Sequence, residues 1–160
     1  MQYNARRHGP WLSVAVVGIL LVAAGLFMIV RGSEAYADIE RELMAEEVMT
    51  SGDATIPGVL VTDAATARAQ ADVIKAHTLG RWGPYSALER DDPRRASFID
   101  GVALRSALNM AVMGFSLAEM AIGTGIIILI AGAATLLFAV PTLHIMAGQV
   151  VPGPSDQKNL

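Results

Sequence analysis

The hydrophobic residues of this chain gather in two long segments instead of spreading evenly. Residues 11–30 carry no charge, and within residues 106–143 only Glu119 is charged at neutral pH. The hydrocarbon core of a bilayer is about 30 Å thick, and roughly 20 helical residues at 1.5 Å per residue cross it. Each segment is long enough to cross, so the pattern predicts two transmembrane helices.

The predicted fold class is an all-α membrane protein, an antiparallel hairpin of two transmembrane helices with a small helical extramembrane domain between them. The expected order is a short cytoplasmic tail at 1–10, a transmembrane helix at 11–31, the extramembrane domain at 32–105, a second transmembrane helix at 106–141, and a cytoplasmic tail at 142–160. Within the second helix, the membrane core is expected at about 119–140.

Helix-breaking and helix-capping residues divide the middle of the chain. Residues 33–49 lack Pro and Gly and extend the first helix until residues 50–53 break it. After a short extended link at 59–61, Thr62 or Asp63 caps a helix that runs to about Thr78 and ends at Gly80.

The second membrane segment belongs to a longer predicted helix. Asp92 is a good N-cap and Pro93 suits the first helical position. A turn at 81–85 and one helical turn as far as Arg90 precede it. No breaker follows before Pro141, so one helix of about 48 residues, roughly 70 Å long, is expected from residue 93.

Composition limits the classes of function. The chain is 53% hydrophobic and 17% charged, with a net charge of −3, and its 12 Lys and Arg residues are scattered among 15 acidic residues. Such a distribution does not favour nucleic acid as a partner. The absence of cysteine excludes disulfides and thiolate metal sites.

The first apolar segment could also be a cleaved secretion signal, since Arg6, Arg7 and His8 precede it and Ala35-Tyr36-Ala37 follows. Its 20 residues exceed the roughly 7 to 15 of a signal peptide, which favours an uncleaved anchor.

The side of the membrane on which residues 32–105 lie is set by competing charges. Arg6 and Arg7 favour a cytoplasmic N-terminus, whereas four arginines on the loop side favour the reverse: Arg31, Arg94, Arg95 and Arg105. The first helix usually dominates, and loops longer than about 60 residues translocate largely regardless of charge. We therefore expect a multi-pass protein of the plasma membrane with an extracytoplasmic loop.

Small residues on both apolar segments predict where the two helices pack. At 100° per residue, one face of the second helix collects Gly114, Ala118, Ala121, Gly125 and Gly132. The first helix offers Gly18, Gly25 and Gly32 at intervals of seven. If Gly25 lies beside Gly125 in an antiparallel pair, Gly18 lies beside Gly132, and small residues there permit close backbone approach.

A polar stripe lies on another face of the second helix and comprises Arg105, Asn109, Ser116, Glu119 and Gly123, together with Val112. Polar groups near lipid need protein or water as partners. The stripe therefore predicts contact with another subunit or a second copy. Alternatively, Glu119 sits at the membrane interface and reaches water or Arg31, or it transfers protons or ions.

No catalytic or metal site is predicted, and no cofactor. The histidines are His8, His77 and His144, and His77 is across the membrane from the other two, so three ligands cannot converge within one chain. The acidic pairs Glu46-Glu47 and Asp91-Asp92 are more typical of helix ends than of paired-carboxylate catalysis. An enzyme is not expected.

Several short motifs together resemble a known group. They are LMAE at 43–46, AQADVIKAH at 69–77, YSAL at 85–88 and LRSALNMAVMGF at 104–115. In this order the chain resembles uncharacterised two-pass actinobacterial membrane proteins, over most of residues 12–138. Some relatives carry the label "aromatic ring-opening dioxygenase", which would need metal ligands that the three histidines do not supply. The resemblance implies the two-pass architecture and no catalytic residues.

The expected function is that of a non-enzymatic integral membrane protein, an accessory or structural subunit that contacts a larger membrane complex or self-associates. Its partners would be the lipid bilayer and another membrane protein or a second copy. Two alternatives stay open: a small receptor or sensor whose extracytoplasmic helices bind a ligand, and a proton or ion carrier that uses Glu119.

Overall fold

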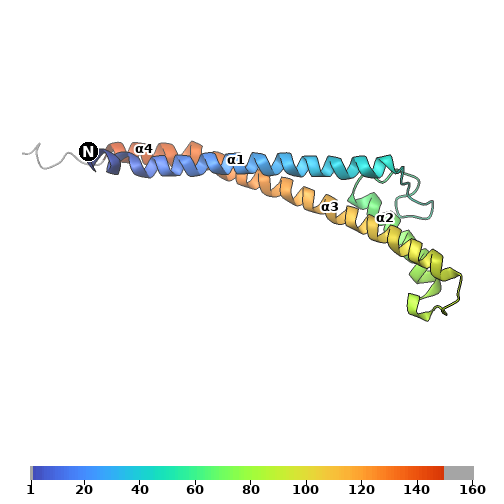
Figure 1. Ribbon diagram of the computed structural model, residues 1–160. Helices are drawn as coiled ribbons and strands as arrows, with labels where there is room; N and C mark the ends of the chain where they lie inside the picture. Colours follow the sequence, from blue (N-terminus) through green and yellow to red (C-terminus); the bar gives the residue numbers. More distant parts are fainter. Residues whose placement is uncertain (1, 150–160) are drawn as a thin grey trace, which may run out of the picture. The chain divides into compact units, whose positions relative to one another are not determined.

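The chain is helical throughout most of its length. The computed structural model describes residues 2–149, and side chains are described for residues 11–147. The elements, in order, are α1 (Gln2–Ala45), α2 (Ala64–Lys75), the π-helix η1 (Ala76–Gly80), the 3₁₀-helix η2 (Tyr85–Ala87), α3 (Arg94–Ala134), the π-helix η3 (Thr135–Ala139) and α4 (Val140–Gln149) (Figure 1). Residues 2–149 contain no β-strand, so the all-α part of the predicted fold class is confirmed.

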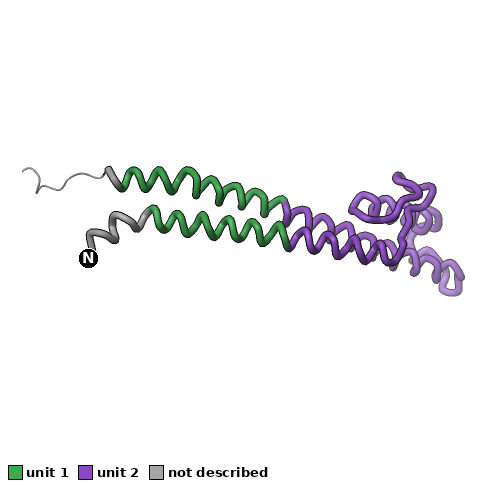
Figure 2. The backbone as a smooth tube through the Cα atoms, turned by 90° about the horizontal axis from the view of Figure 1, so that it is seen from above, with its two compact units in different colours: residues 1–30, 123–160 green, residues 31–122 purple. Residues whose placement is uncertain are grey.

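The chain divides into two compact units, which Figure 2 distinguishes by colour. Unit 1 comprises residues 1–30 and 123–160, and unit 2 comprises residues 31–122. Unit 1 therefore contains the more apolar part of each long helix. Unit 2 contains the segment that connects them.

In unit 1, the first part of α1 runs antiparallel to the end of α3 and to α4. The pairing is visible in the glycines: an ideal Cβ on Gly25 would lie 2.7 Å from the carbonyl oxygen of Gly125, and one on Gly132 would lie 3.0 Å from that of Gly18. At the other end of the pair, the rings of Trp11 and His144 make an edge-to-face contact with centroids 5.2 Å apart.

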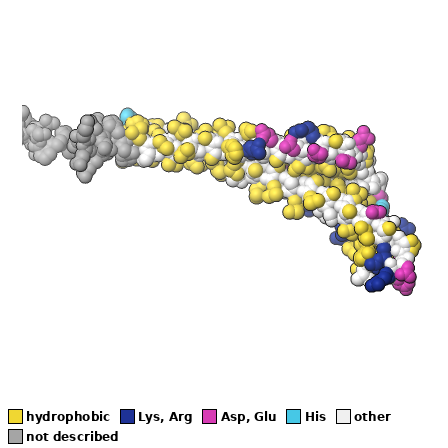
Figure 3. Space-filling view, viewed as in Figure 1, with side chains coloured by type: hydrophobic (Ala, Val, Ile, Leu, Met, Phe, Trp, Pro, Cys, Tyr) yellow, Lys and Arg dark blue, Asp and Glu magenta, His cyan; other side chains and the backbone are white. Residues whose placement is uncertain are grey.

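Two helical stretches are long and apolar enough to cross a membrane by length and composition, Trp11–Ala45 and Arg94–Ala147. Among the 18 most apolar consecutive residues of each stretch, only 11% are buried in the first and 6% in the second. The visible surface of unit 1 in Figure 3 is accordingly covered by hydrophobic side chains, while charged side chains gather on unit 2. These helices are therefore unlike the buried core helices of a soluble domain.

Pro141 does not end the last helix, contrary to the sequence prediction. Helical structure continues through α4 to Gln149, within the segment predicted as the tail 142–160, of which residues 150–160 lie outside the described residues. Proline lacks an N–H and its ring crowds the carbonyl group four residues earlier. The wider π-turn η3 lies just before Pro141, and a π-turn provides the room that lets a helix pass a proline.

The core of unit 2 lies where α2 packs against α3. It consists of Val61, Ala67, Ala71, Leu108 and Val112, with Leu43, Val48, Ala64, Ile74 and Ala111 packed against it. Phe115 is fully buried and its ring contacts that of Tyr36, with centroids 4.7 Å apart. The last part of α1 is thereby fixed to α3 within this unit.

The first helix ends at Ala45, four residues earlier than the predicted end at residue 49. Glu47 adopts a left-handed φ of 48°. The amide of Val48 then donates to the carbonyl oxygen of Leu43, and that of Glu47 donates to Met44. This is the Schellman pattern, with glutamate at a position where glycine is usual. A lack of Gly therefore did not prevent termination.

Residues 48–61 fold back on themselves. Met49 and Leu60 form an isolated antiparallel bridge. The amide of Thr50 donates to the carbonyl oxygen of Val59 at 2.8 Å, and the amide of Val61 donates to that of Val48 at 2.8 Å. The predicted extended link at 59–61 is thus one arm of a short hairpin-like loop, which delivers Val61 to the core.

The N-cap of α2 is Asp63, one of the two predicted candidates. Its carboxylate accepts the amide of Thr66 at 2.8 Å, and the Thr66 hydroxyl in turn caps the Asp63 backbone. That hydrogen bond holds the pKa of Asp63 below its usual value. The predicted end at Gly80 agrees with the end of η1, although residues 81 and 82 are still helical, and the positive φ of 75° lies at Gly83 and not at Gly80.

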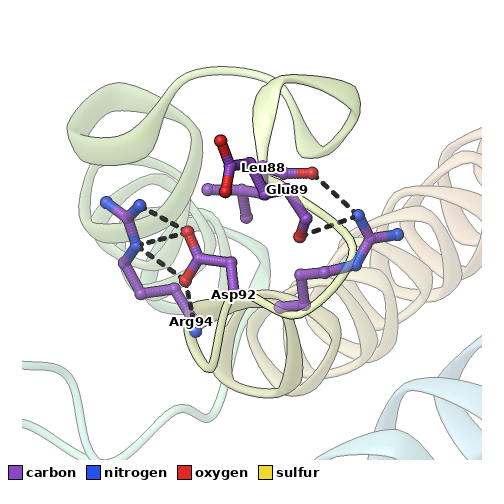
Figure 4. A network of polar contacts seen from close by, with 5 residues as sticks. Leu88, Glu89, Asp92 and Arg94 are labelled. Carbon is purple, nitrogen blue, oxygen red and sulfur yellow. Dashed lines mark hydrogen bonds and ion pairs between the residues drawn. The ribbon is translucent and has the colours of Figure 1, made fainter.

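The predicted start of the long helix is confirmed within one residue. Asp92 accepts the amide of Arg94 at 2.8 Å and also forms an ion pair with the Arg94 guanidinium (Figure 4). The hydrogen bond from the Arg94 side chain is the main reason that the pKa of Asp92 is lowered. Arg95 turns to the preceding loop and donates to the carbonyl oxygen of Leu88 at 2.8 Å.

Candidate functional site

The predicted packing residues in unit 1 lie against one another. Cβ atoms on Gly25 and Gly125 would each meet backbone atoms of the facing helix at 2.7–2.8 Å, and Gly132 would meet the amide nitrogen of Val22 at 2.7 Å. Gly18 faces the side chain of Leu136 at 2.7 Å. The spacing of seven thus gives the same pairs that the structure contains, and the helices approach closely because no side chains intervene.

The remaining small residues of that face lie in unit 2. Gly32 approaches the carbonyl oxygen of Ala118 at 2.9 Å, measured from its ideal Cβ. The end of the Ile39 side chain occupies the space beside Gly114, 2.7 Å from an ideal Cβ placed on that glycine. Ala118 is buried and Ala121 is half-buried. Small residues therefore line the α1–α3 contact within this unit as well.

The polar stripe is only partly a surface. Asn109, Ser116 and Glu119 are exposed and Arg105 is half-buried, but Val112, which shares their side of the helix, is 7% exposed. α2 and the preceding loop pack there, because Val112 belongs to the core with Val61 and Ala67. The helical wheel could not reveal this, since it places residues around one helix without showing what covers them. Gly123, in unit 1, has open space around it.

The polar side chains of the stripe are satisfied in different ways. The Ser116 hydroxyl donates to the carbonyl oxygen of Val112 at 2.8 Å, within its own helix. The predicted interfacial partner of Glu119, Arg31, instead pairs with Glu34 at 2.7 Å. Asn109 and Glu119 make no side-chain hydrogen bond or salt bridge among the described residues. These two side chains are available to solvent or to another molecule.

The titratable residues considered for chemistry are dispersed. His77 contacts the carboxylate of Asp53 at 2.7 Å, with both side chains 58% exposed, and His144 packs on Trp11. His8 lies outside the residues whose side chains are described. Within residues 11–147, no three His, Asp or Glu side chains come together as a metal ion would require. Glu47 ends α1 and Asp92 caps α3, so both have structural roles.

An aromatic cluster in unit 2 was not predicted from the sequence. The ring of Phe98 lies 5.6 Å from that of Tyr85 and 6.4 Å from that of Trp82, and the Arg95 guanidinium lies 4.2 Å from the centre of the Tyr85 ring. An open apolar hollow of about 290 Å³ lies beside it, lined by Tyr85, Phe98, Ile99 and Val102. In the sequence, this cluster is indicated only by Trp82 and Tyr85, which lie on the two sides of Gly83-Pro84.

Comparisons with known proteins add no relative. No family model, no curated protein and no solved structure matches the chain. The functional argument therefore depends on the geometry of the described residues.

Proposed function

We propose that this chain is a non-enzymatic, two-pass integral membrane protein. The apolar parts of α1 and α3 would anchor it, and unit 2 would be presented at the bilayer surface as a small helical domain for contact with another membrane protein or a second copy. The single observation that carries this proposal is the exposure of the two apolar helices. Large side chains such as Ile19, Phe27 and Ile127 are 59%, 66% and 69% exposed.

Lipid is the solvent that suits such a surface. Transfer of apolar surface out of water contributes about 25 cal/mol per Å², so a long helix pair covered by Leu, Ile, Val and Phe would not stay dispersed in water. The backbone of the pair is hydrogen-bonded within its helices, as a bilayer requires. The first charged residue after the apolar part of α1 is Arg31, which marks one boundary of the hydrocarbon.

The role of an accessory or structural subunit is favoured over that of an enzyme. The described titratable side chains do not converge, whereas the exposed polar residues Asn109 and Glu119 lie on a helix that continues into the proposed membrane. Such residues are typical of contacts with a neighbouring protein. We place the domain of residues 32–105 on the extracytoplasmic side of the plasma membrane.

Site-directed labelling tests the proposed topology. Because the chain has no cysteine, single variants report without background. In intact cells, an impermeant maleimide should label Ser86→Cys in unit 2 but not Ala24→Cys in the apolar part of α1, even after permeabilisation. Labelling of Ala24→Cys as fast as Ser86→Cys would show that water, and not lipid, surrounds α1.

Purification in mild detergent tests the proposed contact. We expect a second protein or a second copy to accompany the full-length chain, and Glu119→Leu to weaken that association. A strict monomer, with Glu119→Leu equally abundant in membranes, would exclude a contact through the polar stripe.

A receptor or sensor is the second candidate, and the apolar hollow favours it. The hollow is lined by aromatic and branched apolar side chains, a lining typical of sites for small apolar ligands. Thermal unfolding of the full-length protein, with and without a set of small aromatic compounds, separates the two roles. A ligand that raises the midpoint in wild type but not in Phe98→Ala would favour the receptor.

A further inference from the structure

A second exposed apolar surface runs along α3 within unit 2, apart from the polar stripe. It contains large side chains that are 53–66% exposed, namely Ile99, Met110, Met113, Leu117 and Met120. Two small exposed residues continue the same line, Ala103 and Ser106. We call these seven residues the methionine face. None of them is charged, over about 33 Å of helix.

The spacing of the methionine face is that of a coiled coil. From residue 99 to residue 120 its members follow at steps of four, three, four, three, four and three. Such steps average 3.5 residues and define the a and d positions along which helices pack side by side. A face that met only solvent would have no reason to exclude charge at every one of these positions.

The hairpin itself does not use this face. The most deeply buried α3 residues of unit 2 include Leu108, Phe115 and Ala118, at 2%, 0% and 3% exposure. Phe115 lies about 160° around the helix from Met113 and from Leu117. The methionine face therefore points away from the contacts that hold unit 2 together.

Lipid does not account for the part of the face that precedes Leu117 either, given the proposed anchoring; Leu117 and Met120 lie near the level of Gly32, where the proposed hydrocarbon begins. Gly114 contacts Ile39 and Phe115 contacts Tyr36, so this part of α3 lies beside the part of α1 that follows Arg31. That part of α1 carries many exposed charged side chains: Glu34, Asp38, Arg41 and Glu42. Charged residues at this density remain outside hydrocarbon. Met110 and Met113 are therefore at the level of water.

We propose that the methionine face is the interface with a second copy of this chain, packed parallel. The inference rests on the proposed function, because copies anchored in one membrane share one orientation. In a parallel coiled coil each a or d residue meets its own counterpart. Each of these face residues, Met110, Met113 and Leu117 among them, would pack against the same residue of the second copy. Methionine adapts well to such contacts because its side chain is flexible and polarizable.

The residues that flank the face are compatible with two identical helices. The flanking positions from 102 to 121 are uncharged and mostly small: Val102, Ala107, Asn109, Gly114, Ser116 and Ala121. No like charges are therefore brought together. Gly114 already faces Ile39 of the same chain, so α1 lies beside this edge of the face. Near the start of α3, Arg95 and Asp100 occupy the g position and the following e position, which in a parallel pair lie opposite each other with opposite charges.

This charge arrangement favours the parallel orientation, because in an antiparallel pair g positions face g positions and Arg95 would not meet Asp100. Arg95 already donates to the Leu88 carbonyl oxygen, and a guanidinium has five N–H donors, so it can also meet Asp100 of the second copy. Asn109 and Ser116, from the polar stripe, flank the same interface. Glu119 lies about 160° around the helix from Leu117 and is outside this interface, so the Glu119→Leu test of the polar stripe is separate from the tests of the methionine face.

Disulfide trapping in native membranes tests the interface with the full chain. Met113→Cys and Leu117→Cys are oxidised with copper phenanthroline, beside two controls that are exposed but off the face, Leu104→Cys and Ala35→Cys. We expect disulfide-linked species of twice the chain mass for the two face variants, several-fold above the controls. Equal cross-linking at all four positions, or none, would overturn the proposal.

Other occupants give different results. A cross-linked band at a mass other than twice that of the chain would mean that a different protein covers the face. Protection of Met113→Cys from an aqueous maleimide without any dimer would mean that lipid covers it. Both results would refute the second copy while leaving the membrane anchor intact, since anchoring is measured separately by the labelling of Ser86→Cys and Ala24→Cys.

A charge placed on the face provides an independent test. Two differently tagged copies are co-expressed and one is captured in mild detergent. Met113→Glu in both copies should lower recovery of the second tag at least several-fold, whereas Leu104→Glu should not, with both variants retained in the membrane fraction. Undiminished recovery with Met113→Glu would contradict the proposal.

Discussion

Replacing Gly125 by alanine tests the close approach of the two helices in unit 1. A Cβ at this position would lie 2.8 Å from the carbonyl oxygen of Gly25 and 3.0 Å from the amide nitrogen of Ile29. Ordinary contacts of a Cβ lie at 3.4–4 Å, so the two backbones must move apart. Overpacking of this kind costs about 1–3 kcal/mol.

The same substitution at Gly123 supplies a matched control. No atom lies within 4 Å of a Cβ placed there. Both variants gain the higher helix propensity of alanine, up to about 1 kcal/mol. Gly125→Ala should therefore be less stable than Gly123→Ala by about 1–3 kcal/mol, the cost of overpacking alone.

The contact between Trp11 and His144 offers a readout. In a Trp82→Phe background, Trp11 is the only tryptophan in the chain, and its ring touches His144 when unit 1 is folded. Unfolding is followed by Trp11 fluorescence as SDS is added to the protein in mild detergent. If Gly125→Ala and Gly123→Ala unfold at the same SDS fraction, the reasoning about the glycine pair is refuted.

Three further predictions concern unit 2 and use thermal unfolding of the full-length protein in detergent. Phe115→Ala should destabilise it by about 3–5 kcal/mol, because the ring is fully buried, whereas Leu104→Ala, at a half-exposed site, should cost under about 1 kcal/mol; equal losses would contradict the assigned core. Asp63→Ala should cost about 0.5–2 kcal/mol by removing the N-cap. Because the pKa of Asp63 is lowered in the folded state, its carboxylate stabilises the fold at pH values above the ordinary pKa near 3.9, and this stabilisation is lost as the pH falls through the folded pKa. The Asp63→Asn variant should therefore lose less stability in acid than wild type. An unchanged pH profile would argue against the cap. Glu47→Gly should stabilise by up to about 1 kcal/mol, because glycine adopts the left-handed φ of 48° without strain; a lower midpoint would contradict this.

The sequence predicted the features that depend on local chemistry. The sequence predicts Asp92 as a cap, and Asp63 as one of two candidates beside Thr62, because aspartate accepts the free amides of a helix N-terminus. The glycine pairs of unit 1 followed from a spacing of seven, which places residues on one side of each helix. Long uncharged segments predicted the two apolar helices.

Features that depend on tertiary contacts or on unusual backbone geometry were missed. After α1 ends at Ala45, Glu47 adopts a left-handed conformation that is unfavourable for glutamate. Leu43 and Val48, on either side of this turn, both pack against the core. A π-turn before Pro141 let the last helix continue. A helical wheel places Val112 on the polar stripe because it contains no information about α2, which covers this residue.

The methionine face also shows that sequence periodicity alone does not distinguish the buried faces of a helix from the exposed ones. Its heptad spacing is present in the sequence, but two other faces of the same helix also have regular spacings, through the small residues and through the polar stripe. Only the burial of Leu108 and Phe115 distinguishes the face used within the chain from the one left exposed. Periodicity predicted a helix, and burial was needed to separate its faces.

The central claim is that the exposed apolar surface of unit 1 is solvated by lipid, and alkaline extraction measures this most directly. Membranes from cells that express the full-length chain are washed with sodium carbonate and sedimented. We expect the chain to remain in the pellet and to be released only by detergent. Recovery of the intact chain in the supernatant, as a dispersed species without detergent, would contradict the account.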